Sequence, residues 1–167
     1  MTAMRNAGFG ARNRTGSFRT PHAPLRSPTD SILRLVDANA NRALEGLRVC
    51  EDIVRFHYAS RLHSRRLREL RHGIAEAVRG LPVGAAQLVR ARASGRDVGR
   101  RAPSSRVDTL ERLLLINLQR TKEALRTLEE TSRLIAPGRA AAFQRLRFRT
   151  YDAERDVLLT LEALRHR

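Results

Sequence analysis

The sequence predicts an all-α fold: a single-domain bundle of about five helices with a two-fold internal repeat. Three observations lead to this prediction. The chain of 167 residues has room for one ordinary hydrophobic core and not for several domains. Apolar residues recur at helical intervals along most of its length. One helical motif occurs twice, far apart in the chain.

The individual helices are predicted from the apolar period and from the residues that start and stop it. N-cap residue types at 29–31 open a first long helix over about 31–58. A second helix follows and is stopped by Gly80 and Pro82. The remaining predicted elements are a short helix over 83–93, a loop over 94–106, and long helices over about 107–135 and 139–165.

Basic residues outnumber acidic ones by 33 to 17, which gives a net charge of +16. Residues 1–29 carry five arginines, no acid and no apolar period, and we expect a flexible basic N-terminal tail ahead of a helical domain over 30–167. Lys122 is the only lysine, so arginine dominates, and its planar fork binds phosphates and carboxylates. Aromatic residues make up only 4%, which disfavours a nucleic-acid partner.

Several other classes of protein are disfavoured by what the sequence lacks. Cys50 is the only cysteine, so we expect no disulfide framework, a packing role for this thiol and a reducing, cytoplasmic location. The longest apolar run is the four residues 113–116, so no membrane partner is expected. Neither a P-loop nor a dinucleotide fingerprint occurs, so a nucleotide would be held by other means.

The internal repeat relates the first and fourth predicted helices at an offset of 78 residues. The pattern N-x-x-R-x-x-E-x-L-R-x-x-E-[DE]-x-x-R begins at Asn39 and again at Asn117. It predicts a pseudo-symmetric bundle in which both copies contribute equivalent side chains to one central region. The polar members are Asn39, Arg42, Glu45, Arg48, Glu51, Asp52 and Arg55 in the first copy and Asn117, Arg120, Glu123, Arg126, Glu129, Glu130 and Arg133 in the second.

Each copy distributes its polar residues over two faces of its helix. Asn39 lies in the middle of the apolar sector and Arg42 at its edge, and Asn117 and Arg120 repeat this placement. Burial of such groups is costly unless they are paired. Either the two repeats hydrogen-bond to each other, or these residues form a buried polar site for an anionic or heterocyclic ligand.

The other charged residues of the motif, including Glu51, Asp52 and Glu129, are predicted to lie on the opposite, solvent-facing side. They are spaced three or four residues from arginines, as in the ion-pair ladders of surface helices. Such ladders add little stability, and a solvated ion-pair face is the favoured interpretation of these residues taken alone.

Five segments of the chain occur in an order that resembles a known family. They are DANANRALEGLRVCED (37–52), LRELRHGI (67–74), ARASGRDVG (91–99), INLQRTKEALRTLEE (116–130) and FQRLRFRTYDAE (143–154). Together they resemble the small helical domain often fused ahead of thiamine-phosphate synthase, the monofunctional hydroxymethylpyrimidine-phosphate kinase of thiamin biosynthesis. The resemblance covers about residues 32–156. The synthase barrel has no counterpart, so the resemblance implies a free-standing kinase.

The resemblance implies that ATP, with Mg²⁺, phosphorylates 4-amino-5-hydroxymethyl-2-methylpyrimidine phosphate to the diphosphate. The implied catalytic residues are Arg42, Arg120, Arg92 and Asp97, with the arginines on phosphates and Asp97 on magnesium. The implied metal ligands are Glu51, Glu129 and Asp52. The implied substrate-binding residues are Asn39, Asn117, Glu45, Glu123, Arg48, Arg126, Arg71, His72, Gly99, Arg147 and Tyr151, with an asparagine on the pyrimidine edge. One departure from the family pattern is Ala93, where an acid is expected.

Two other functions stay open on the sequence. A non-catalytic helical partner or regulatory module of thiamine-phosphate synthase would have unpaired apolar surface and no inward-facing arginine cluster. A basic nucleic-acid-binding protein would show arginines along one exposed stripe and binding that falls steeply with salt. The oligomeric state, including a homo-oligomer, also stays open.

Overall fold

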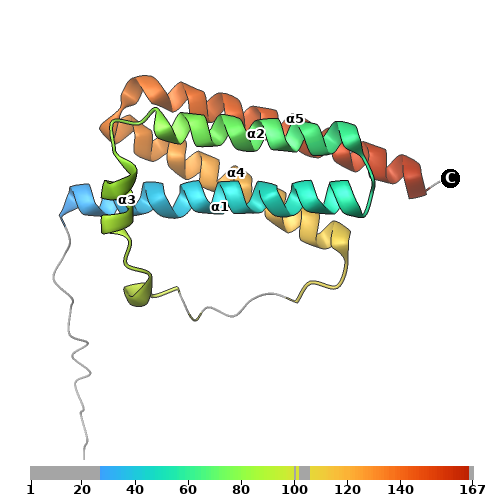
Figure 1. Ribbon diagram of the computed structural model, residues 1–167, viewed down its shortest axis with the longest axis horizontal. Helices are drawn as coiled ribbons and strands as arrows, with labels where there is room; N and C mark the ends of the chain where they lie inside the picture. The colour runs from blue at the N-terminus through green and yellow to red at the C-terminus, as the bar shows by residue number, and fades with distance from the viewer. Residues whose placement is uncertain (1–26, 100, 102–105, 166–167) are drawn as a thin grey trace, which may run out of the picture.

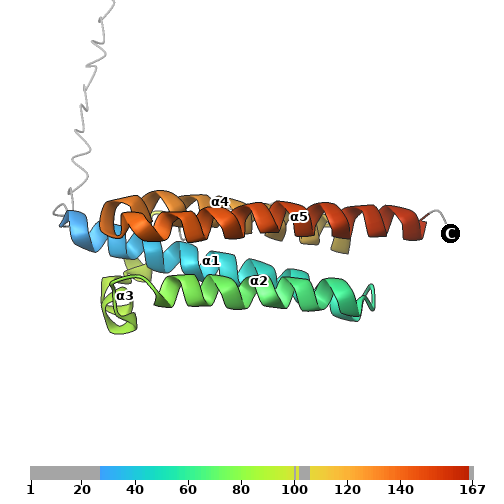
Figure 2. The ribbon, with the colours of Figure 1, turned by 90° about the horizontal axis from the view of Figure 1, so that it is seen from above.

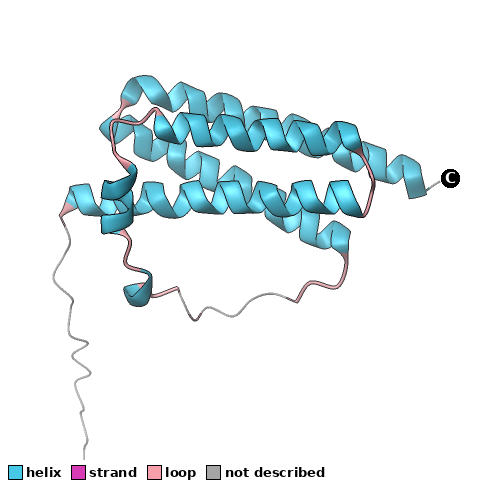
Figure 3. Cartoon of the chain, in the orientation of Figure 1, coloured by secondary structure: helices cyan, strands magenta, loops and turns pink. Residues whose placement is uncertain are grey.

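A computed structural model describes residues 27–99, 101 and 106–165. Its ordered elements are all helical, and this part of the chain contains no strand (Figure 3). The α-helices are α1 (Pro28–Phe56), α2 (Arg61–Arg79), α3 (Ala85–Ala91), α4 (Leu110–Ile135) and α5 (Ala140–Arg165), joined in places by the 3-10 turns η1 (Ser94–Arg96) and η2 (Pro137–Arg139). The predicted all-α, single-domain fold is confirmed.

Capping groups set the helix ends and correct several predicted boundaries. The first helix begins at Pro28, not at 31, because the Ser27 hydroxyl accepts a hydrogen bond from the Asp30 amide at 3.1 Å and proline is favoured in the first turn. α4 begins three residues later than predicted, where the Thr109 hydroxyl caps the Arg112 amide at 3.1 Å. Of the predicted tail over 1–29, residues 1–26 lie outside the described residues.

The four long helices form two layers. α1 packs against α4 in one layer and α2 against α5 in the other, and α1 also packs on α2 and α4 on α5 (Figures 1 and 2). The short helix α3 lies against the N-terminal half of α1 (Figure 1). Residues 92–99, which follow α3 and include η1, lie on the side of α1 turned away from α2 (Figure 1). We call this side of α1 and α4 the open face.

α1 and α4 cross closely and run antiparallel. A Cβ atom on Gly46 would lie 2.6 Å from Thr121 Oγ1 and 3.0 Å from the Asn117 carbonyl oxygen. Farther along, Cys50 Sγ donates to the Leu114 carbonyl at 3.6 Å. This register relates the two repeats by a pseudo-two-fold axis through the crossing, as the internal repeat predicts.

The core lies between the two layers. Its largest fully buried side chains include Leu47, Leu67, Leu125 and Phe143. Burial, followed by the nearby charge of Glu154, raises the pKa of the Cys50 thiol to about 12. This supports the predicted packing role of the cysteine. Among the described helices, none combines the length and apolar character needed to cross a membrane.

Candidate functional site

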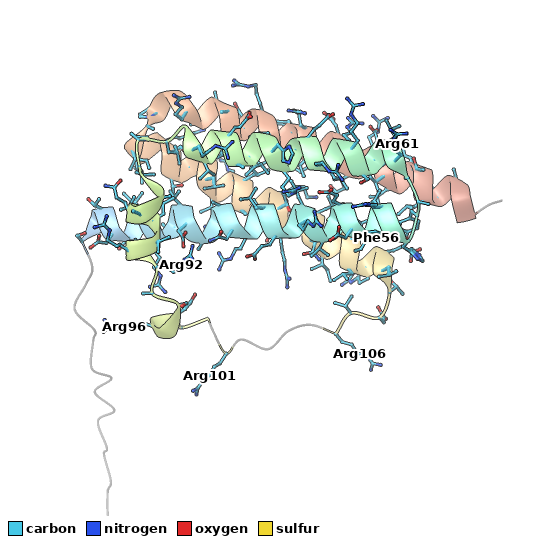
Figure 4. The ribbon with its side chains drawn as sticks, in the orientation of Figure 1. Phe56, Arg61, Arg92, Arg96, Arg101 and Arg106 are labelled. Carbon is cyan, nitrogen blue, oxygen red and sulfur yellow. The ribbon has the colours of Figure 1, made fainter. Side chains whose placement is uncertain are left out.

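A pocket on the open face brings three of the predicted site residues together. It has a volume of about 390 Å³ and is lined by Ser31, Arg34, Leu35, Ala38, Asn39, Arg42 and Asp97. The first six belong to one side of α1, and Asp97 follows η1, which lies beside α1 (Figure 4). We call this cavity the open-face pocket. It combines two guanidinium groups, one carboxamide and one carboxylate.

The carboxamide of Asn39 is buried and held in one orientation. Its Nδ2 donates to the Leu35 carbonyl at 2.8 Å, and its Oδ1 accepts from Arg42 Nη1 at 3.5 Å. Asn117 is also buried and donates to the Leu113 carbonyl at 2.8 Å. Each asparagine therefore bonds within its own helix, and the interpretation that the two repeats hydrogen-bond to each other through these amides is wrong.

Arg42 and Arg120 are exposed on the open face. In the antiparallel register, Arg42 lies opposite residues 121–125, so Arg120 is offset from it by about 2–8 Å along the helix axes. The pseudo-two-fold axis places their helix positions on the same side of the α1–α4 layer. The two arginines thus flank the crossing as a pair, close to the open-face pocket.

An ion pair missed in the sequence analysis positions the segment that carries Asp97. Arg92 Nε and Nη2 donate to the two carboxylate oxygens of Asp37 at 2.8 and 2.7 Å. Arg34 Nη2 donates to the Ala93 carbonyl at 3.2 Å. Hydrogen bonding to Asp37 and the charges of Asp37 and Glu45 raise the pKa of Arg92 above its ordinary value. Ala93, the departure from the family pattern, therefore contributes its backbone here.

The predicted solvent-facing placement of Glu51 and Glu129 is wrong, because both side chains are buried between helices. Glu51 accepts from Arg68 Nε at 2.8 Å and from Arg71 Nε at 3.3 Å, both on α2. Glu129 accepts from Arg147 Nη2 of α5 at 3.0 Å. Burial acts to raise the pKa of Glu51, but the hydrogen bonds and charges of its arginines outweigh it and hold that pKa below its ordinary value.

The predicted metal ligands do not converge. Glu51 lies between α1 and α2, Glu129 lies between α4 and α5, and Asp52 Oδ2 accepts from Arg48 Nε at 3.1 Å. Among the residues that the structure describes, no group of three or more acidic, histidine or cysteine side chains could hold a metal ion. Asp97 lies apart from these carboxylates, in the open-face pocket, where its Oδ1 accepts from the Gly99 amide at 2.9 Å.

Four residues predicted to bind substrate line a second cavity, between α4 and α5. It has a volume of about 440 Å³ and is lined by Gln119, Lys122, Glu123, Arg126, Arg147 and Tyr151. Lys122 Nζ lies 5.3 Å from the centroid of the Tyr151 ring and donates to both carboxylate oxygens of Glu154 at 2.6 and 2.8 Å. The hydrogen bond to Tyr151, together with that to Glu129, raises the pKa of Arg147.

The remaining predicted site residues lie outside both cavities. Arg71 is bound to Glu51, and His72 is exposed on α2, in the layer away from the open face. Glu45 and Arg48 are exposed on α1. The predicted set therefore falls into separate groups: Asn39, Arg42 and Asp97 line the open-face pocket, whereas Glu123, Arg126, Arg147 and Tyr151 line the cavity between α4 and α5.

Asp37 and Lys122 form ion pairs beside the two cavities, although neither was predicted to be a site residue. Asp37 has no acidic counterpart in the second repeat, where Leu115 stands, so the comparison of repeats did not select it. Lys122 replaces Leu44 of the first copy. At each of these positions one repeat has a charged residue and the other has leucine. This difference between the repeats is the sequence feature that could have identified Asp37 and Lys122.

A family model describing the ThiD2 family matches residues 34–156, which is most of the chain. The chain belongs to the ThiD2 family. The match contains most of the open-face pocket and both buried glutamates of this ThiD2 family member. It agrees closely with the range of about 32–156 over which the motifs show their resemblance. The kinase activity that the resemblance implies stays a prediction.

Relatives of this ThiD2 family member carry the name thiamine-phosphate synthase. The one from Synechocystis sp. is 38% identical over 135 residues, which are 79% of this chain and 37% of the relative. The one from Rhodopirellula baltica is 35% identical over 141 residues, 82% of this chain and 37% of the relative. The chain thus spans little more than a third of the length of these relatives. No solved structure matches.

Proposed function

We propose that this chain transfers a phosphoryl group from ATP to 4-amino-5-hydroxymethyl-2-methylpyrimidine phosphate in thiamin biosynthesis, on the open face of α1 and α4. The observation that carries the proposal is the convergence of Asn39, Arg42 and Asp97 in one pocket. Membership in the ThiD2 family and the name of the relatives, thiamine-phosphate synthase, support the pathway.

The open-face pocket suits the electrostatic demands of this reaction. Phosphoryl transfer depends mainly on positioning and on stabilisation of charge at the transferred group. The acceptor is itself a phosphate monoester, so two anionic substrates must be held close together. Arg34 and Arg42 line the pocket, and Arg120 lies across the α1–α4 crossing. We place the pyrimidine phosphate in the pocket and the nucleotide phosphates beside Arg120.

Asn39 supplies directional recognition. A carboxamide offers one donor group and one acceptor group, which can pair with the edge of a nitrogen heterocycle. The bond to the Leu35 carbonyl fixes the amide, so its orientation is set before a ligand arrives. A pocket of about 390 Å³ falls within the usual range for small-molecule sites and accommodates one of the two substrates.

Asp97 is the residue that fits a magnesium ion in this proposal. Magnesium sites at phosphates commonly use one or two carboxylates together with phosphate oxygens, and the ion neutralises charge on the phosphates. Asp97 is exposed and lines the open-face pocket. Glu51 and Glu129 do not fit, because arginines already bind their carboxylates. We therefore assign the two glutamates to the fold.

The test is ADP formation by the purified chain with the pyrimidine phosphate, ATP and Mg²⁺, measured without any synthase and then confirmed by coupling to thiamine-phosphate synthase. R42A, R120A and D97N are compared with R155A, a control that removes an exposed arginine outside both cavities. Loss of one charged contact to the transition state is expected to lower kcat by roughly 10²–10³-fold, with R155A unchanged. Equal rates in all four variants would move the reaction away from the open face.

The second candidate function is a helical module that binds or regulates thiamine-phosphate synthase. It is favoured by the fact that this chain aligns with little more than a third of relatives bearing that name. Folded wild-type chain that forms no ADP but binds purified synthase, or changes its rate, would support this function and refute the kinase. ADP formation without synthase would refute the module as the whole function.

A further inference from the structure

The turn between α1 and α2 encloses a cavity that none of the predicted roles uses. Its volume is about 490 Å³, and it is lined by Arg55, Ala59, Ser60, Arg61, Ser64, Arg65 and Arg68. We call it the arginine cavity. Arg61 lies at the end of the bundle opposite to Arg92, so the arginine cavity is far from the segment that carries Asp97 (Figure 4). Arg55 is separated from Arg42 by about 20 Å along α1.

The lining of the arginine cavity is strongly cationic, with four arginines and no carboxylate. Arg65 and Arg68 donate through Nε to Glu69 and Glu51, at 2.9 and 2.8 Å, so these bonds leave the Nη nitrogens of both side chains for another acceptor. Arg55 and Arg61 form no ion pair with a carboxylate among the described residues.

The backbone adds to the positive potential. Ala59 adopts a φ of 49°, and this left-handed residue turns the chain from α1 into α2 beside the cavity. α2 then begins with no acidic residue in its first turn and no side-chain cap. The Ser60 hydroxyl instead bonds to His63 Nδ1 at 2.8 Å. The partial positive charge of the helix start therefore adds to the four guanidinium groups.

We propose that the arginine cavity binds the di- or triphosphate group of a small molecule. Planar guanidinium forks bind phosphate oxygens in pairs, and four of them match the charge of a polyphosphate better than that of a single phosphate. The arginines surround one concave site, which suits a compact ligand better than an extended nucleic-acid backbone. This site lies apart from the open-face pocket and does not depend on the proposed kinase reaction.

The test uses inorganic pyrophosphate and tripolyphosphate as probes of the full chain, by isothermal titration calorimetry and by shifts of backbone amide resonances. Shifts are expected at residues 59–65. R61Q and R65Q are expected to weaken binding about tenfold each, because each removes one charge-assisted contact. The control R155Q removes the same charge on an exposed part of α5 and is expected to leave the affinity unchanged. Circular dichroism checks that each variant is folded.

Comparison of ATP, the pyrimidine diphosphate and pyrophosphate then identifies the source of the phosphate group. If one organic ligand binds more tightly than pyrophosphate and R61Q removes that difference, that ligand is the source of the phosphate group. The proposal is overturned if R155Q weakens binding as much as R61Q does, or if pyrophosphate shifts only residues of the open-face pocket. It is also overturned if a single-stranded oligonucleotide outcompetes pyrophosphate at the same arginines, since that would indicate a nucleic-acid contact.

Discussion

Replacement of Glu51 by glutamine measures what the buried carboxylate contributes to the fold. Glutamine keeps the shape of the side chain but removes its charge, so the hydrogen bonds from Arg68 and Arg71 lose their ionic partner. Glu51 is fully buried, whereas the side chains of Arg68 and Arg71 are 46% and 24% exposed. Water can therefore solvate the two arginines once the carboxylate is gone.

This difference in exposure sets the expected magnitude. Breaking a fully buried ion pair costs about 3–5 kcal/mol, because one charge is left uncompensated. Partial solvation of the arginines lowers the expected loss for E51Q to about 2–3 kcal/mol. Of the three arginines that pair with Glu129, Arg126 and Arg133 are 53% and 55% exposed, but the Arg147 side chain is only 12% exposed and would be left buried without its carboxylate. E129Q is therefore expected to lose more, about 3–4 kcal/mol.

Urea unfolding followed by circular dichroism at 222 nm gives both free energies of unfolding. E69Q is the matched control, because Glu69 pairs with Arg65 in solvent and its loss is expected to lower stability by less than about 1 kcal/mol. If E51Q and E129Q were as stable as E69Q, the two carboxylates would not be structural. Full stability combined with loss of ADP formation would return them to the role of metal ligands.

Three further predictions follow from local geometry. G46A is expected to lower the free energy of unfolding by roughly 1–3 kcal/mol, because its Cβ would lie 2.6 Å from Thr121 Oγ1, and the double variant G46A/T121A should regain part of that loss in the same urea titration. The difference in unfolding free energy between wild type and E51Q is expected to be constant above the ordinary glutamate pKa of 4.5. It is expected to shrink as the pH falls through the lower pKa of the folded state, because the unfolded chain takes up the proton first. A difference that grew on acidification would contradict the lowered pKa of Glu51. Cys50, with its pKa raised to about 12, is expected to react with iodoacetamide at pH 8 only as fast as the chain unfolds, and rapid labelling of the native protein, measured by mass spectrometry, would show that the thiol is accessible.

The helices were predictable because the signal that defines them is local. An apolar residue every three or four positions produces one buried side whatever the partner helix is, so the existence of the long helices followed from the sequence alone. Helix ends depend on single capping groups. Ser27 and Thr109 each offered such a group, but several neighbouring residues are equally good caps by type.

The burial of Glu51 and Glu129 was not predictable from one helix. A helical wheel assigns a charged residue to solvent unless a partner is known, and here the partners come from other helices: Arg68 and Arg71 from α2 and Arg147 from α5. In addition, α1 contacts both α2 and α4, so its buried arc is wider than the apolar sector of the sequence suggests. The two glutamates lie in that extra arc.

Asn39, Arg42 and Asp97 were predicted as members of a larger set of site residues, and the sequence did not single out these three or their common pocket. Asn39 and Arg42 follow from their spacing on one helix, whereas Asp97 reaches the same pocket only because Arg92 and the Ala93 carbonyl fasten the intervening segment to α1. The ion pair that holds this segment requires Asp37, and the second repeat has Leu115 at the equivalent position.

The pseudo-symmetric framework therefore carries an asymmetric site. The two repeats supply equivalent asparagines and arginines on either side of the crossing, and symmetry alone would produce two equal half-sites. Asp37 occupies the position that Leu115 has in the second copy, and the segment tied to it delivers Asp97 to the first half only. Lys122, in place of Leu44, instead shapes a cavity with Tyr151 beside the second half. Since the proposed transfer joins two different substrates, this loss of symmetry at otherwise matched positions is what the reaction requires.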